Sequence, residues 1–365
     1  MTVRYANLRS RILLGREFRR QSVEPLRLPE WIAQGLDRVE QRWCGVDTHD
    51  VPIDRPIFLI GMPRSGTSVT QDLLCSHPDV AFIGNAMFRL PSAPILVDSV
   101  LRSLNLNAEA ERFIADSVPV RVDSPADITV LWGLLFGMPD WRCCREFEGR
   151  DHRACEEAIA TSLAAHRDRL VTLLRKVVWN SGQPYRRFFT KQLASALGIK
   201  AMLQQFPDAR FLHVVRNPEQ VANSSVKLHR RNVLRRKRWW HVRAPSPQVL
   251  IPRWPRLGEY AERYGVEDPR ASASIWRDHI DYLDEIKHAL PHYHEFRYED
   301  LLADPRTVLG EILEFLELEP VPAEHAAYWD LFNRIGVTHH RNDYGRFDEI
   351  RSICGEAMRR HGYEA

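Results

Sequence analysis

The residues best suited to binding an anion lie in one short segment, residues 61–68 (GMPRSGTS), which follows the apolar run 57–60 (IFLI). Glycines let backbone N–H groups turn inward around an anion, and the first N–H groups of a following helix attract it further. Arg64 adds a cation, and Ser65, Thr67 and Ser68 add hydroxyls. The segment predicts a phosphate-binding loop, with a plain strand-to-helix turn as the alternative.

This loop differs from that of a nucleoside triphosphatase, which has a Lys where Thr67 stands and a hydroxyl for magnesium next to it. The second buried run, 209–215 (ARFLHVV), leads into Arg216 rather than into an Asp suited to magnesium. The pattern therefore favours a protein that binds a phosphate or phosphosulfate without metal. A P-loop small-molecule kinase is the alternative.

Arg216 is a second candidate for anion binding, because open α/β sheets bind ligands at the carboxyl ends of their strands. Its guanidinium can bind phosphate bidentately, and Ser224 follows two helical turns later with a hydroxyl. A surface ion pair for Arg216 and a solvated helix serine for Ser224 are the alternatives.

These residues need a scaffold, and the sequence alternates buried strands with helices. We expect strands at 57–60, 209–215 and, more weakly, 294–298, and helices at 67–75, from about 219, and at 300–318. The pattern predicts an α/β, three-layer P-loop-like fold with a central parallel sheet. Residues 1–50 predict a helical N-terminal segment packed on the main domain, with Trp31, Ile32, Leu36, Val39 and Trp43 at helical spacing.

Composition excludes several classes of protein. The chain has 365 residues, of which 44% are hydrophobic and 27% charged, which excludes a disordered or collagen-like protein. We find no apolar run long enough for a transmembrane helix and no secretory signal, so we expect a cytoplasmic protein. Six cysteines without a CxxC pair predict neither a disulfide framework nor a zinc site.

Positive charge is concentrated in one segment. Ten Lys or Arg and no acid lie between Gln220 and Gly258, so the remainder carries 3 − 10 = −7. Trp239 and Trp240 follow the basic helix. The segment predicts either recognition of an anionic acceptor or peripheral contact with the inner face of the membrane through residues 227–243. It lacks the aromatic platform of a nucleic-acid-binding protein.

Three motifs resemble the sulfotransferases that use 3′-phosphoadenylyl sulfate. Residues 56–68 resemble their 5′-phosphosulfate loop, and residues 206–218 with Ser224 resemble their 3′-phosphate element, with the family spacing of eight between Arg216 and Ser224. Residues 297–302 (RYEDLL) with Pro305 resemble a late Y-E-D-L element. The similarity is greatest to the bacterial branch, which also resembles tyrosylprotein sulfotransferases.

The resemblance implies a sulfotransferase domain over residues 51–365, with a basic, Pro-rich insertion around 227–256. It implies sulfuryl transfer from 3′-phosphoadenylyl sulfate, without metal, to a hydroxyl or amine of a saccharide, lipid or small metabolite. The implied donor-binding residues are Arg64, Ser65, Gly66, Thr67, Ser68, Arg216 and Ser224. A catalytically inactive nucleotide-binding partner protein is a further alternative.

Sulfuryl transfer passes through a loose transition state, so cations and positioning supply most of the catalysis. Beside Arg64, Lys191 matches a family lysine that neutralises the leaving group; a surface lysine is the alternative. The tyrosylprotein-like Glu is missing at residues 84–86 (GNA). Asp127 lies where the bacterial branch has acids after Ser-Pro and is the candidate general base, with helix capping as the alternative.

Overall fold

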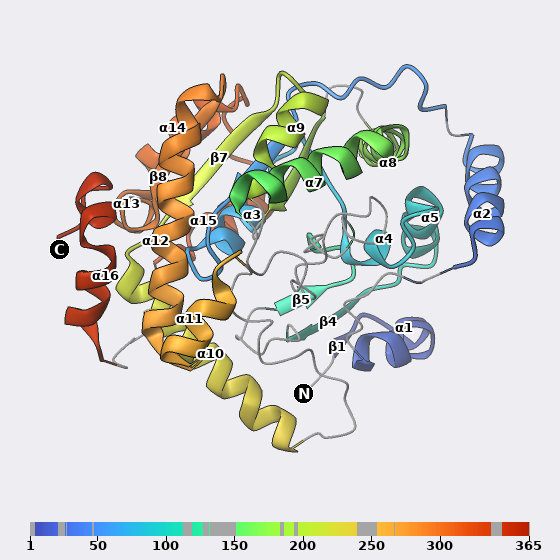
Figure 1. Ribbon diagram of the computed structural model, residues 1–365. Helices are drawn as coiled ribbons and strands as arrows, with labels where there is room; N and C mark the ends of the chain where they lie inside the picture. The colour runs from blue at the N-terminus through green and yellow to red at the C-terminus, as the bar shows by residue number, and fades with distance from the viewer. Residues whose placement is uncertain are drawn as a thin grey trace.

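The computed structural model describes residues 4–20, 26, 28–45, 47–111, 119–126, 131, 151–182, 186–192, 196–238, 254–265, 267–336 and 345–364. Its main sheet has five parallel strands in the order β3-β6-β2-β7-β8 (Figure 1). The strands are β2 (Ile57–Ile60), β3 (Val80–Phe82), β6 (Arg187–Gln192), β7 (Arg210–Val215) and β8 (Tyr293–Arg297). The predicted central parallel sheet is confirmed.

Helices cover both faces of this sheet, because alternate residues of the central strands point to opposite sides. Ile57 and Leu59 of β2 pack with one set of helices, α3 (Thr67–Cys75), α13 (Tyr298–Ala303), α14 (Pro305–Phe315) and α15 (Ala326–Phe332). The other set is α7 (His152–Ala165), α8 (Arg167–Asn180), α9 (Ile199–Gln205), α10 (Pro218–Arg238), α11 (Leu257–Tyr264), α12 (Pro269–Ile286) and α16 (Phe347–Arg360). The fold therefore has the three predicted layers.

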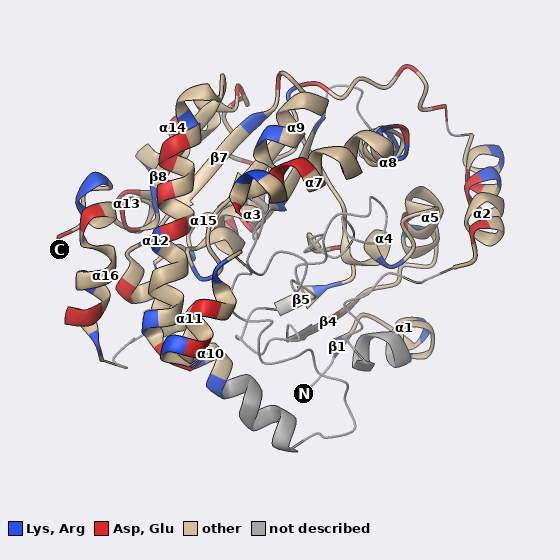
Figure 2. Cartoon of the chain, in the orientation of Figure 1, with Lys and Arg blue, Asp and Glu red and all other residues tan. Residues whose placement is uncertain are grey.

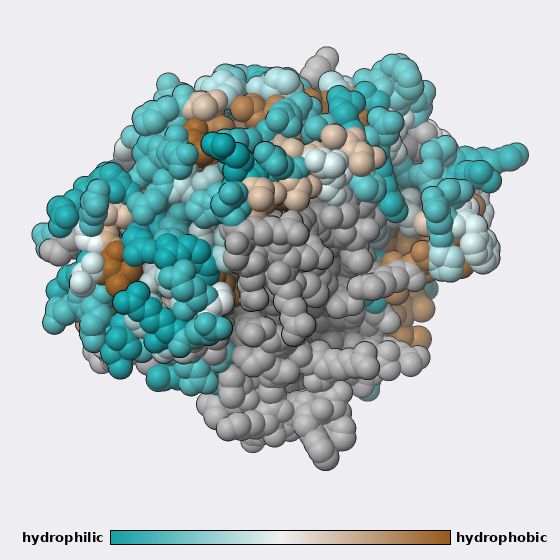
Figure 3. All heavy atoms as spheres, viewed as in Figure 1, coloured by the Kyte–Doolittle hydropathy of each residue, from teal (hydrophilic) through white to brown (hydrophobic). Residues whose placement is uncertain are grey.

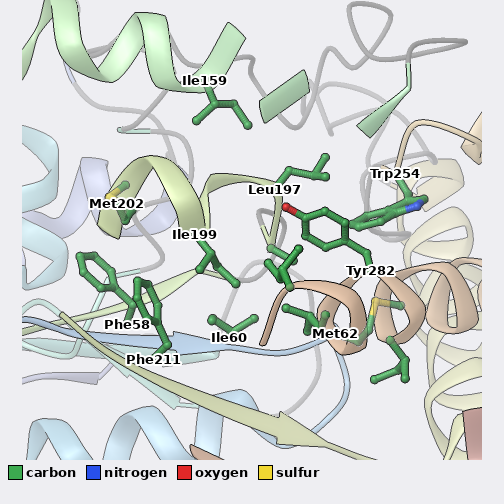
Figure 4. Packing of buried hydrophobic residues seen from close by; sticks show 14 of the residues in the cluster. Phe58, Ile60, Met62, Ile159, Leu197, Ile199, Met202, Phe211, Trp254 and Tyr282 are labelled. Carbon is green, nitrogen blue, oxygen red and sulfur yellow. The ribbon is translucent and has the colours of Figure 1, made fainter. Parts of the chain in front are cut away.

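The core on the second face is the larger of the two. Phe58 and Ile60 of β2 and Phe211 of β7 point toward Ile199 and Met202 of α9 (Figure 4). The Phe58 and Phe211 rings stack with centroids 5.6 Å apart. Because β2 is buried on both faces, its position is fixed, and the loop that follows it starts from a rigid strand.

The described part of the N-terminal segment contains two helices and one short strand. β1 (Arg4–Tyr5) pairs with β4 (Ala108–Glu111), which pairs with β5 (Pro119–Arg121) in a small antiparallel sheet. α1 (Leu8–Arg20), α2 (Glu30–Trp43), α4 (Asn85–Arg89) and α5 (Pro94–Ser103) lie on the same side of the molecule (Figure 1). Trp31 and Trp43 of α2 are 74% and 82% exposed.

Two predictions of elements need correction. The helix expected at 300–318 is divided at Asp304, where α13 ends and α14 begins with Pro305. Proline fits the first turn of a helix but not its interior, and the Asp304 carboxylate accepts from Thr307 N at 3.1 Å. The weaker strand expected at 294–298 is β8, one residue earlier, and β3 and β6 were not predicted.

A buried polar cluster joins the C-terminal end of α16 to the sheet. His361 Nδ1 lies 2.7 Å from Glu295 Oε1 on β8, and His361 Nε2 lies 3.2 Å from Asp284 on α12. Burial opposes protonation of His361, but hydrogen bonding and the charges of Glu295 and Asp284 prevail and raise its pKa. Burial also opposes ionisation of Glu295, yet hydrogen bonds from His213 and His361 lower its pKa. The cluster thus favours an ion pair.

Candidate functional site

The predicted anion-binding loop joins β2 to α3 and forms a narrow turn over the helix start. Gly66 is the N-cap in the left-handed region at φ 93°, and its carbonyl accepts from Val69 N at 3.0 Å and Thr70 N at 3.2 Å. Arg64 is also left-handed, at φ 75°. The start of α3, with Thr67 and Ser68 in its first turn, therefore presents backbone N–H groups and the positive end of a helix dipole.

Two positions of this loop need glycine because neighbouring atoms lie where a Cβ would be. A Cβ on Gly61 would lie 2.8 Å from the carbonyl oxygen of Val214 on β7. A Cβ on Gly66 would lie 2.1 Å from Cδ2 of Tyr298. The backbone of the loop is thus held between the end of β7 and the tyrosine ring.

The structure brings both predicted anion sites together. Arg64 Nε donates to Ser224 Oγ at 3.0 Å, although 160 residues separate them. Arg216 Nη1 donates to the carbonyl oxygen of Arg64 at 2.8 Å. The loop after β2 and the β7–α10 junction therefore form one continuous site at the carboxyl edge of the sheet, as expected for an open α/β fold. The guanidinium of Arg64 lies at the Ser224 side of this site.

Two residues of the Y-E-D-L element support the site, and residue chemistry alone did not assign them a role. The Arg216 guanidinium lies over the Tyr298 ring, 4.9 Å from its centroid. Glu299 Oε1 accepts from Asn217 N at 3.1 Å, directly after Arg216, and Glu299 Oε2 accepts from Tyr363 Oη at 2.9 Å. Their signal in the sequence was the resemblance of residues 297–302 to a family motif.

Two buried polar atoms of the site have no hydrogen-bond partner in the part of the chain that the structure describes. Among the described residues, Ser65 Oγ and Arg216 Nε are buried and form no hydrogen bond. Leaving buried polar groups unpaired costs about 1–3 kcal/mol each, so such atoms indicate a site built for a ligand. The site combines arginines with hydroxyl and N–H donors, which fits a phosphate or phosphosulfate.

Lys191 lies on β6, directly opposite Leu59 of β2, and is 1% exposed. Its side chain points to the same face as Leu59 and Phe189, the face that α3 covers. Burial raises the pKa of the Cys75 thiol at the end of α3, and Asp72 adds to this, while the nearby Lys191 charge partly offsets it. The surface-lysine alternative is therefore wrong, and Lys191 is a buried cation next to α3.

The candidate base Asp127 lies outside the described residues, but the residue before it is placed. The carbonyl of Ala126 accepts from Gln71 Nε2 of α3 at 3.3 Å. Ala126 N donates to Ile83 O at 2.9 Å. The chain leading to Asp127 thus packs on the helix of the anion-binding loop.

The basic segment is described only in part. α10 carries its first residues, and Figure 2 shows blue on α10 just before the helix continues in grey. Residues 239–253, including Trp239 and Trp240, lie outside the described residues. In the described ranges, no group of three or more His, Cys, Asp or Glu is placed to hold a metal ion, and no helix there is long and apolar enough to cross a bilayer.

A family model described as "Sulfotransferase family" matches residues 56–322. The omega-hydroxy-beta-dihydromenaquinone-9 sulfotransferase Stf3 of Mycobacterium tuberculosis is 24% identical over 332 residues, 85% of this chain and 76% of the relative. The fold is similar to sulfotransferase STF9 from Mycobacterium avium, with TM-score 0.50 and 18% identity over 90% of this chain and 82% of that one. Sulfotransferase STF1 from M. tuberculosis has TM-score 0.50 and 14% identity over 89% of this chain and 82% of that one.

Proposed function

The chain belongs to the sulfotransferase family, and we propose that it takes the sulfuryl group from 3′-phosphoadenylyl sulfate and transfers it to a hydroxyl or amine of a lipid, saccharide or small metabolite. The observation that carries the choice of donor is the pair of contacts from Arg64 to Ser224 and from Arg216 to the Arg64 carbonyl. They support one ligand with anionic groups at two ends.

The chemistry of the donor matches this arrangement. It carries a phosphosulfate on its 5′ oxygen and a phosphate on its 3′ oxygen, whereas ATP has no 3′-phosphate. We assign the 5′ group to the start of α3, with Ser65, Gly66, Thr67 and Ser68, and the 3′-phosphate to Arg216 and Ser224. Arg64 lies between the two and contributes to both.

In the proposed reaction the acceptor oxygen or nitrogen attacks sulfur, and the bond from sulfur to the 5′-phosphate oxygen breaks. Adenosine 3′,5′-bisphosphate leaves with the bonding electron pair, and the acceptor proton passes to a general base, for which we propose Asp127. Arg64 and Lys191 stabilise the charge on the leaving oxygen. Burial of Lys191 supports this role, because an ammonium acts more strongly where water is excluded.

The first acceptor to test is suggested by a relative of this chain. The printed name of the mycobacterial relative specifies a hydroxylated dihydromenaquinone, so a hydroxylated lipid is the first acceptor to test. We assign the basic segment 227–256 to recognition of anionic groups on the acceptor. Cellular extract incubated with sulfur-labelled donor, followed by mass spectrometry of the labelled products, would identify the acceptor directly.

The donor assignment is tested by calorimetry with adenosine 3′,5′-bisphosphate and with ATP plus magnesium. We expect the bisphosphate to bind without a divalent metal, and Arg216→Ala to weaken it by about 2–4 kcal/mol, as for loss of a charge-assisted contact. Arg359→Ala, which removes an exposed arginine of α16, is the matched control. A metal requirement, or equal binding of ATP, would exclude the proposed donor.

A further inference from the structure

The exposed hydrophobic side chains of this protein are concentrated on its N-terminal helices. Among the described residues, the large hydrophobic side chains that are exposed all belong to α1, α2, α5 and short segments beside them: Leu8, Ile12, Leu13, Leu26, Trp31, Val39, Trp43, Val100 and Leu104. Figure 3 shows brown, hydrophobic atoms on the right-hand side, where Figure 1 places α2 and α5. We call these residues the N-terminal apolar face.

The orientation of α2 is fixed by a buried polar contact on the side of the helix opposite Trp31. Glu40 is fully buried, and its Oε2 accepts from Ile95 N at 2.7 Å and from Leu96 N at 2.9 Å, at the start of α5. Its Oε1 pairs with Lys176 Nζ of α8 at 2.6 Å. A carboxylate at a helix start is favourable, and a buried charge without its partner is costly. The helix is thus held with an acidic residue inward and its tryptophans outward.

Positive charge accompanies the exposed hydrophobic residues. Arg38 and Arg42 are exposed and lie seven and eleven residues after Trp31, which places them on the same side of α2. On α1, Arg9 and Arg11 are exposed, as are the hydrophobic residues Leu8, Ile12 and Leu13. Tryptophan and aliphatic residues flanked by arginines are typical of segments that lie in the headgroup region of a bilayer.

We propose that the N-terminal apolar face docks this protein on the surface of an anionic lipid bilayer. The exposed arginines of this face favour an anionic bilayer as its partner over a second copy of the chain. Arg9, Arg11, Arg38 and Arg42 outnumber Glu30 among the exposed charged residues that the structure describes on α1 and α2. A symmetric dimer through this face would bring two net positive surfaces together, and like net charges oppose association. An anionic headgroup layer instead pairs with the arginines while the tryptophans enter the interface. The inference stands on surface residues alone and does not depend on the proposed donor site.

The docking face is linked through packed elements to the anion-binding loop. α1 follows β1 and packs beside the small sheet, in which β1 pairs with β4 and β4 pairs with β5. The chain after β5 reaches Ala126, whose carbonyl binds Gln71 of α3. Docking by this face would therefore hold the transferase domain beside the membrane, where a hydroxylated lipid is available.

The test is co-sedimentation of the full chain with phosphatidylcholine vesicles, with and without phosphatidylglycerol, at low and high salt. We expect binding to the anionic vesicles that weakens with salt. Trp31→Ser with Trp43→Ser should reduce partitioning roughly tenfold or more, since both side chains leave the interface. Arg9→Gln with Arg11→Gln should reduce it about fivefold per arginine.

Controls separate this face from other surfaces. Arg359→Gln on α16, on the opposite side in Figure 1, should bind vesicles like the unaltered protein. The proposal is overturned if the unaltered chain stays in solution with anionic vesicles, or if Lys227→Gln with Arg230→Gln abolishes binding while the tryptophan variants retain it. It is also overturned if the tryptophan variants only dissociate a dimer seen by light scattering. Calorimetry with adenosine 3′,5′-bisphosphate should give the affinity of the unaltered chain for the variants of the N-terminal apolar face. If those variants fail to support the docking proposal, the proposed donor is therefore unaffected.

Discussion

Replacing Gly66 with alanine tests the arrangement that holds the anion-binding loop. The added Cβ would lie 2.1 Å from Tyr298 Cδ2 and 2.3 Å from Cε2, far inside van der Waals contact. The ring cannot simply rotate away, because its face packs on the Arg216 guanidinium. The variant must therefore displace Tyr298 or distort the loop.

The magnitude has two parts. A non-glycine residue at φ 93° costs about 1–2 kcal/mol in backbone energy. Overpacking a tight contact costs a further 1–3 kcal/mol or so. We expect Gly66→Ala to lower the free energy of unfolding by about 2–5 kcal/mol and to weaken binding of adenosine 3′,5′-bisphosphate, since Tyr298 no longer supports Arg216.

Gly182 provides a matched control. It has φ 84°, and among the described residues no heavy atom lies within 4 Å of a Cβ built there. Gly182→Ala should therefore lose only the backbone part, about 1–2 kcal/mol, with unchanged ligand affinity. Urea denaturation followed by circular dichroism gives the free energies, and calorimetry gives the affinities.

A double variant isolates the contact itself. In Gly66→Ala with Tyr298→Ala the overlap is gone, so the two changes should couple favourably by about 1–3 kcal/mol. If Gly66→Ala costs no more than Gly182→Ala, or if the double variant shows no coupling, the close packing of Tyr298 on the loop is refuted.

Three further outcomes are expected. Arg216→Lys should bind adenosine 3′,5′-bisphosphate more tightly than Arg216→Ala but less tightly than the unaltered chain, because lysine keeps the charge without the bidentate geometry. If calorimetry gives the same affinity for both variants and the unaltered chain, Arg216 does not belong to the site. Lys191→Met, which keeps the buried volume, should lower single-turnover sulfate transfer by roughly 10²–10³ at saturating donor while the dissociation constant changes little, and a normal rate would end its catalytic assignment. The melting temperature should fall as pH rises through the raised pKa of His361, because its ion pair with Glu295 is complete below about pH 6.5 and is lost when His361 deprotonates. His361→Gln should remove this pH dependence, and an unchanged slope of melting temperature against pH would show that other groups cause it.

The sequence alone predicted the central elements of the candidate anion-binding site. Four consecutive apolar residues before a glycine-bearing loop identified β2, and the helix expected at 67–75 has those bounds in the structure. The run 209–215 with Pro218 predicted β7 and the start of α10. These signals are local, because a strand buried on both faces is continuously apolar and proline favours the first turn of a helix.

The sequence pattern did not predict β3 and β6, and each has a physical reason. β3 has three residues, too few for a periodic pattern. β6 contains Arg187, Thr190 and Lys191, whose polarity hides a buried strand. Arg187 Nη2 donates to the carbonyl oxygen of Arg55 at 2.6 Å, 132 residues away, a partner that only the folded chain provides.

Tertiary structure decided which residues share a site and which side of a helix is outward. The order of the strands brings Arg64 to Ser224 across 160 residues, and no local pattern encodes that order. The spacing of apolar residues on α2 correctly indicated an amphipathic helix, but its orientation depends on Glu40 binding α5 and α8. A periodic sequence defines the faces of a helix, whereas its partners in space determine which face is buried.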